Sequence, residues 1–149
     1  MLRLVLLATH YPLLATPPMI LFLRALFIVV IASMLAVTSW ASLHTPLFAI
    51  PREVFTHPWF IATLFDAYWA FVAFYVWVAW KEQSLAARIL WFVAIIALGN
   101  IAMAAYFLRE LFRVPADGAL DPVFTRRNPG TLVLPGLLTA ASLAVYLLA

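Results

Sequence analysis

The chain has 149 residues, of which 67% are hydrophobic and 10% are charged, and it contains no cysteine. This composition lies far outside that of soluble domains, and the lack of cysteine excludes disulfides, thiolate metal sites and iron–sulfur clusters. The formal net charge of +3 comes from nine basic residues spread over several short segments. That pattern is typical of membrane topology signals and argues against nucleic-acid binding.

The apolar runs predict an all-α membrane protein, a bundle of four transmembrane helices forming one domain over residues 1–149. The four spans are expected over residues 18–40, 58–80, 86–108 and 130–149. Each is close to the ~20 residues that cross a hydrocarbon core of ~30 Å at ~1.5 Å per residue. Nothing between them is long enough to fold as a separate domain.

The N-terminal segment, residues 1–23, is apolar but is interrupted by three prolines, Pro12, Pro17 and Pro18. Because proline breaks a continuous helix, we expect a short interfacial arm before the first span. The apolar run continues to Leu43, which is too long for the hydrophobic region of a removable signal peptide. We therefore expect the segment to be retained, with Met19 as an alternative start.

The loop over residues 42–58 contains several apolar side chains, so we expect it to fold back against the bundle. His44 and His57 lie near its two ends. Two imidazoles there could ligate haem, a chlorin or a metal. Neither histidine has a metal-ligand spacing, so we favour helix capping or loop packing and predict no cofactor and no metal site.

The second span carries a single charge, Asp66, with Trp59 at one end and Trp77 and Trp80 toward the other. Amphipathic indole rings prefer the headgroup layer, which supports a membrane-spanning helix. A carboxylate inside hydrocarbon is costly unless it is protonated, hydrogen-bonded or paired. The other helices are therefore expected to supply partners for Asp66.

A short turn after Lys81 makes the third span an antiparallel neighbour of the second. Counted from their shared membrane surface, Asp66 and Asn100 lie at depths that differ by about one helical turn, roughly 4.5 Å. The same estimate places Ser33 near that depth, and Thr63 shares a helix face with Asp66. The predicted site is a polar seam of Ser33, Thr63, Asp66 and Asn100. Two roles for this seam stay open: it handles a ligand or protons, or it only joins the helices by hydrogen bonds.

The segment from Arg109 to Gly130 is predicted to be a hydrated loop, because it combines charged residues with proline and glycine. The fourth span is expected to begin near Asn128 and Pro129. With these four spans, four basic residues lie on one side of the membrane and five on the other. The positive-inside rule then gives no orientation.

Two blocks of the chain resemble a known family. They run from Trp40 to Glu82, WASLHTPLFAIPREVFTHPWFIATLFDAYWAFVAFYVWVAWKE, and from Ala87 to Phe112, ARILWFVAIIALGNIAMAAYFLRELF. Together they resemble a membrane protein family of plants and bacteria that is classed as a domain of unknown function. The resemblance implies a small multi-helix membrane protein without an assigned activity, and it supplies no catalytic residues.

Three functions fit these residues. The first is non-catalytic: a subunit, an assembly factor or a lipid- or ligand-binding bundle. The second is an enzyme acting on a lipid or isoprenoid around Asp66 and Asn100, and the third is a small proton-coupled carrier. We favour the first, because no hydrolase, metalloprotease or nucleotide-binding motif is present. The expected partners are membrane lipids, other membrane subunits or a second copy, in the bacterial inner (cytoplasmic) membrane.

Overall fold

The computed structural model describes residues 17–148, and the expected N-terminal arm lies outside this range. Within it the chain forms seven α-helices and one short 3-10 helix, with no β-strand. In chain order these are α1 (Pro17–His44), η1 (Leu47–Ala49), α2 (Arg52–Thr56), α3 (Pro58–Lys81), α4 (Leu85–Leu98), α5 (Asn100–Leu111), α6 (Asp121–Thr125) and α7 (Val133–Leu148). The all-α class is confirmed.

Two helices, α1 and α3, are long and apolar enough to cross a membrane. They contain 28 and 24 residues, which corresponds to lengths of about 42 and 36 Å. Each begins with proline, whose missing N–H and fixed φ suit the first helical turn. Two further apolar helices, α4 and α7, are shorter, with 14 and 16 residues.

The single helix expected over residues 86–108 is instead two helices, α4 and α5, divided at Gly99. Gly99 has φ 53° and ψ −123°, a conformation that residues with a Cβ rarely adopt. A Cβ at this position would also lie 2.7 Å from the ring of Phe71 on α3. Backbone strain and the close aromatic ring together favour glycine at this turn.

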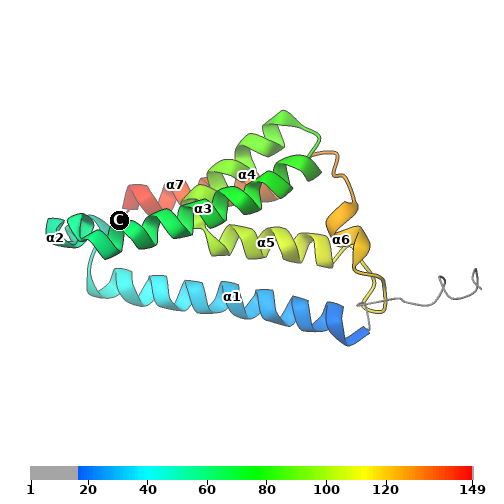
Figure 1. Cartoon of the computed structure of the whole chain (residues 1–149), viewed down its shortest axis with the longest axis horizontal. Coiled ribbons are helices and arrows are strands. Elements are labelled where there is room, and N and C mark those ends of the chain that lie inside the picture. Colours follow the sequence, from blue (N-terminus) through cyan, green and yellow to red (C-terminus); the bar gives the residue numbers. More distant parts are fainter. Residues whose placement is uncertain (1–16, 149) are drawn as a thin grey trace, which may run out of the picture.

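The break at Gly99 makes α4 and α5 a helical hairpin that returns to the end where it started. In Figure 1, α4 leaves the C-terminal end of α3, and α5 runs back to α6 at that same end. Two backbone hydrogen bonds join the segment around Asn128 to the turn after α3 at that end. They run from Asn128 N to Lys81 O (2.8 Å) and from Gln83 N to Asn128 O (2.9 Å). The segment after α5 therefore lies beside the turn after α3. A single third span over residues 86–108 would put these two connections at opposite ends of the bundle, and that expectation is wrong.

The hairpin packs between the remaining helices. On one side α5 meets α1, where Phe27 and Phe107 stack with ring centroids 4.5 Å apart. On the other side α4 meets α7, where Thr139 donates a hydrogen bond to Leu90 O (3.1 Å) and Tyr146 to Ala97 O (3.0 Å).

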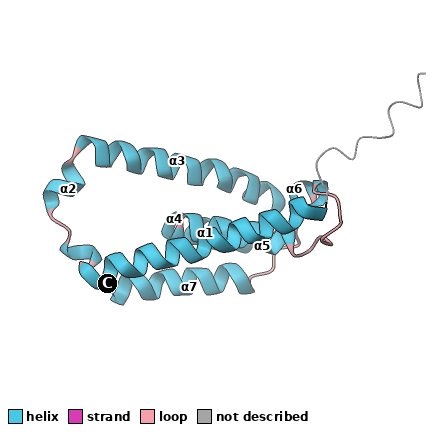
Figure 2. Cartoon of the chain, turned by 90° about the horizontal axis from the view of Figure 1, so that it is seen from below, coloured by secondary structure: helices cyan, strands magenta, loops and turns pink. Residues whose placement is uncertain are grey.

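The core lies around the hairpin and is small. Its main cluster of buried side chains comes from α3, α4 and α5: Val78, Trp91, Ala94, Ile95, Ala102 and Tyr106. A second cluster, Ile20, Leu111, Val114 and Val123, joins the N-terminal part of α1 to the segment after α5. Only Val78 and Lys81 of α3 are buried. Figure 2 shows the α2 end of α3 standing apart from the other helices.

The connection between α1 and α3 is ordered into η1 and α2, each of which begins directly after a proline. It does not fold back on the bundle as expected. None of the residues in these two short helices is buried, and Phe48 is 72% exposed. The two prolines start short helical turns at the far end of α1 and α3, which keeps this connection away from the core.

The last helix begins at Val133, three residues after the start of the expected span 130–149. Gly130 has φ 95°, and a Cβ there would clash with Cβ of Ser84. This extended segment passes closely over the turn between α3 and α4 before α7 starts. The segment from Arg109 to Gly130 is thus partly packed, since Val114, Val123 and Asn128 are buried.

Candidate functional site

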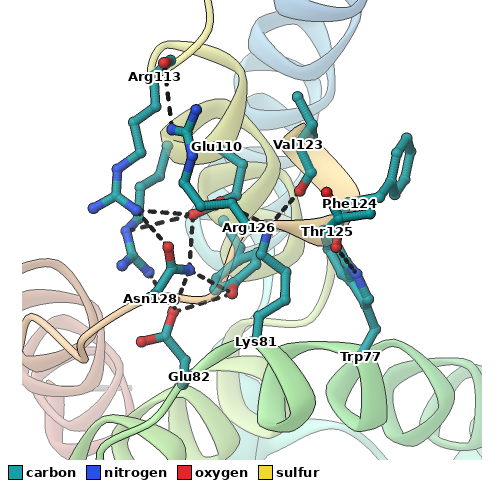
Figure 3. Close-up of polar contacts among 12 residues, drawn as sticks. Trp77, Lys81, Glu82, Glu110, Arg113, Val123, Phe124, Thr125, Arg126 and Asn128 are labelled. Atoms are coloured by element: carbon teal, nitrogen blue, oxygen red, sulfur yellow. Dashed lines mark hydrogen bonds and ion pairs between the residues drawn. The ribbon is translucent and has the colours of Figure 1, made fainter. Parts of the chain in front are cut away.

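The densest group of polar side chains lies at the α6 end of the molecule and forms what we call the buried polar cluster (Figure 3). Its members are Lys81, Glu82, Tyr106, Arg109, Glu110, Arg113 and Asn128. Lys81, Glu82 and Asn128 are fully buried, and Glu110 is 1% exposed. Buried charges are rare unless they are paired, so each member needs partners within the cluster.

The hairpin brings this cluster together from three parts of the chain. Lys81 is the last residue of α3 and Glu82 follows it. Tyr106 and Glu110 are four residues apart on α5, so they lie on one face of that helix. Asn128 comes from the connection between α6 and α7. A continuous helix over residues 86–108 would carry the α5 residues to the opposite end of the bundle.

Two ion pairs link α3 to α5. Lys81 Nζ lies 2.8 Å from Glu110 Oε2, and Arg109 Nη1 lies 2.8 Å from Glu82 Oε1. Lys81 also donates a hydrogen bond to the backbone oxygen of Val123, which lies in α6. Arg113 Nη1 reaches Glu110 Oε1 at 3.3 Å. The ends of α3 and α5 are therefore joined by buried charges of opposite sign.

Asn128 connects the two carboxylates. Its side-chain nitrogen lies 2.9 Å from Glu82 Oε1 and 3.1 Å from Glu110 Oε1, and its side-chain oxygen accepts from Arg113 Nη1 at 2.7 Å. An amide has two N–H donors, which is enough for one bond to each carboxylate. Tyr106 donates a further hydrogen bond to Glu82 Oε1 at 3.1 Å.

This arrangement is suited to holding the helix ends together. Two carboxylates face three cationic side chains, one amide and one phenol, and these groups mainly bond one another. Removing one partner would leave a buried charge uncompensated, which costs about 3–5 kcal/mol. The second carboxylate oxygen of Glu82 is buried and has no hydrogen-bond partner among the described residues.

The predicted seam residues lie elsewhere. Ser33 donates to Val30 O at 3.0 Å and Thr63 donates to Trp59 O at 2.8 Å, each within its own helix. Asp66 and Asn100 are both exposed. No hydrogen bond in the described part of the chain joins any two of the four seam residues. The seam therefore stays a prediction.

The hairpin nevertheless places its tip near the middle of α3. Gly99, which precedes Asn100, lies against Phe71. Phe71 is five residues beyond Asp66 on α3, about 7.5 Å along the helix axis. The tip thus reaches the depth range in which the sequence predicts the seam.

The two histidines remain at the far end from the buried polar cluster. His44 Nδ1 lies 2.8 Å from Trp40 O one turn earlier in α1, and its ring lies against that of Trp40 with centroids 4.9 Å apart. His57 occupies the N-cap position of α3 without a side-chain capping bond. Across residues 17–148 no group of three His, Asp or Glu side chains is placed to hold a metal ion.

An open apolar groove of about 400 Å³ lies along the exposed face of α3. Its lining residues flank Asp66 in the sequence: Leu64, Phe65, Tyr68, Trp69 and Val72. An apolar groove of this kind suits contact with an apolar chain. It is separate in sequence from the buried polar cluster.

The sequence interpretation missed Lys81, Glu82, Glu110 and Asn128 as a group. The available signal was the pair of charges that ends the apolar run of α3, together with a second set of charges spaced along α5. Connecting the two sets requires that the chain turn back at Gly99, which periodicity alone does not indicate.

Comparison with known proteins gives one match. Residues 14–128 match the family described as "Protein of unknown function (DUF1475)". No curated protein and no solved structure matches the chain. The matched region contains every residue of the buried polar cluster and ends before α7. Because the match covers well over half of the chain, the protein belongs to the DUF1475 family.

Proposed function

We propose that this protein is a non-catalytic integral membrane component, a subunit or assembly factor that binds a membrane partner through the exposed face of α3. The observation that carries the proposal is the exposure of α3. Trp59, Phe65 and Trp69 are 77%, 64% and 66% exposed on a helix long enough to cross a bilayer. Large apolar patches on a surface indicate contact with lipid or protein.

Exposure to water would be costly for these side chains. Burial of a large apolar side chain is worth about 1.5–3 kcal/mol, and α1 exposes a similar series that includes Phe22, Val29 and Trp40. A hydrocarbon environment removes that cost, which supports a location in a membrane. We propose the bacterial cytoplasmic membrane.

The state of the polar groups favours a structural role over catalysis. The charged side chains that the fold brings together bond mainly one another and are largely buried. A catalytic acid or base has to reach its substrate, so a cluster closed in this way is better suited to stabilising the fold.

Charge distribution supplies an orientation. Among residues 17–148, seven of the eight Lys and Arg residues gather at the α6 end of the molecule, which we call the basic end: Arg24, Lys81, Arg88, Arg109, Arg113, Arg126 and Arg127. The eighth, Arg52, is in α2 at the opposite end of α3 (Figure 1). By the positive-inside rule, the basic end faces the cytoplasm.

Photo-crosslinking in membranes tests the partner. A photoreactive residue at position 65 or 69, on the exposed face of α3, is expected to give a discrete crosslink to a protein. A matched probe at Trp91, which is buried in the core, is expected to give none. Crosslinks to lipid alone from both α3 positions, or turnover of a lipid by the purified protein, would contradict a non-catalytic partner-binding role.

The apolar groove, whose lining residues flank Asp66 in the sequence, supports a second candidate function. The apolar groove of about 400 Å³ could hold a lipid or isoprenoid chain, and Asp66, an exposed carboxyl on the same stretch of α3, could act on it. Asn100, at the hairpin tip, is the second residue that we assign to this function. Lipid turnover that is lost in Asp66→Asn, with the protein still inserted in the membrane, would favour this function over the first.

A further inference from the structure

The positive charge of the basic end is concentrated on its surface. The seven basic residues there are accompanied by four acidic ones, Glu82, Glu110, Asp117 and Asp121. Glu82 and Glu110 are buried and are already paired with Lys81, Arg109 and Arg113. Few acidic side chains are therefore left to neutralise the exposed arginines.

Two adjacent arginines, Arg126 and Arg127, are exposed and form no ion pair with any described residue. Arg126 Nη1 makes a long hydrogen bond of 3.4 Å to the backbone oxygen of Arg113. Arg127 lies over the ring of Trp80, with its guanidinium carbon 4.8 Å from the ring centroid. Both guanidinium groups keep donors available for an outside ligand.

The backbone that carries these arginines is anchored. The N–H of Arg126 bonds Pro122 O at 3.1 Å, which caps α6. The next residue after Arg127 is Asn128, whose N–H bonds Lys81 O and whose side chain joins the buried polar cluster. The two side chains thus start from fixed positions, which lowers the entropy lost when they bind a ligand.

Aromatic side chains border the arginines on the side of the apolar helices. Trp80 is 48% exposed and Phe124 is 45% exposed, and Trp77 Nε1 donates to Phe124 O at 3.3 Å. Tryptophan at the end of a spanning helix marks the headgroup layer of a bilayer. The arginines therefore lie where lipid phosphates would be.

We propose that Arg126 and Arg127 form a binding site for the phosphate of an anionic phospholipid in the cytoplasmic leaflet. The proposal rests on the membrane location and orientation inferred above. Guanidinium groups bind phosphate oxygens through paired hydrogen bonds, and the Trp80 and Phe124 rings contact the glycerol and upper acyl region. The excess of positive charge selects anionic over zwitterionic headgroups.

Native mass spectrometry of the full chain, purified from membranes in detergent, tests the site. Phosphatidylglycerol and phosphatidylcholine are added separately, and the fraction of lipid-bound protein is measured. The wild type is expected to retain phosphatidylglycerol preferentially. The double variant R126Q with R127Q is expected to bind phosphatidylglycerol about 25-fold more weakly. This figure assumes that each basic residue contributes about 1 kcal/mol to binding.

Two matched variants separate charge from folding. R52Q removes one arginine at the opposite end and is expected to leave phosphatidylglycerol binding unchanged. R126K with R127K keeps both charges and is expected to keep the preference for the anionic lipid. Loss of binding in R52Q, or unchanged binding in the double glutamine variant, would overturn the site.

Inorganic phosphate carries the same charged oxygens as a lipid headgroup, so the arginines could bind it instead. Inorganic phosphate at millimolar concentration is expected to leave bound phosphatidylglycerol in place, and complete displacement would overturn the lipid assignment. Membrane extraction with carbonate is measured first. A chain released by carbonate would contradict the membrane location itself, whereas an inserted chain with no lipid preference would overturn only the headgroup site.

Discussion

The two halves of α3 differ in how they pack against the rest of the molecule. The C-terminal half packs into the core through Val78 and ends in the buried ion pair of Lys81. The N-terminal half has no fully buried residue and carries Asp66 on an exposed apolar surface. One continuous helix therefore supplies both an anchor of the fold and a large unpartnered apolar face, and substitutions in the two halves should act on different properties.

The largest expected effect concerns the anchored half and comes from removing its partner on α5, Glu110. Glu110→Leu leaves the buried Lys81 ammonium without its acid and should lower the free energy of unfolding by about 3–5 kcal/mol. Thermal unfolding of the protein in detergent measures the change. The matched control is Asp66→Leu, an acid of α3 that makes no hydrogen bond in the described structure, for which we expect less than about 0.5 kcal/mol. Equal effects of the two substitutions would mean that the halves do not differ.

The hairpin turn should give an intermediate effect. Gly99→Ala places a Cβ 2.7 Å from the Phe71 ring at a backbone φ of 53°, so we expect a loss of about 1–3 kcal/mol. Combining it with Phe71→Leu should restore the part that is steric, since the smaller side chain leaves room. Gly136→Ala is the control, because a Cβ there meets nothing within 4 Å. A Gly99→Ala protein as stable as the wild type would contradict the strained turn.

The smallest expected effect on stability concerns Asp66. Asp66→Asn preserves shape and removes the charge from an exposed position, so the unfolding midpoint should change by less than the equivalent of about 0.5 kcal/mol. Partner crosslinking from α3 should persist, because the apolar face is unchanged. Loss of crosslinking in a normally folded Asp66→Asn protein would assign binding to the carboxyl and not to the aromatic surface.

The sequence was sufficient for the two long helices. The expected ranges 18–40 and 58–80 coincide closely with α1 and α3, because each is one long apolar run that begins at proline. It was not sufficient for the hairpin. A glycine inside an apolar helix costs only ~1 kcal/mol relative to alanine, so Gly99 alone does not mark a break.

Tertiary contacts favour the break at Gly99, and the hydrophobic periodicity of the sequence does not report such contacts. The Phe71 ring occupies the space beside Gly99, and the ion pairs of the returning helix α5 reach Lys81 and Glu82. Asn128 is 46 residues from Glu82, so no local pattern links them. The buried polar cluster was missed because a continuous third helix would carry Tyr106 and Glu110 away from Lys81 and Glu82.

The position of the segment after α5 is the most direct test of this topology, and a chain without cysteine is well suited to it. Single cysteines at Gln83, Asp117 and Glu53 would be probed with a membrane-impermeant thiol reagent in sealed cells and in inside-out vesicles. The hairpin predicts that positions 83 and 117 are labelled from the same side, the cytoplasm, and position 53 from the other. Labelling of position 117 from the side of position 53 would contradict the hairpin and restore a continuous third span.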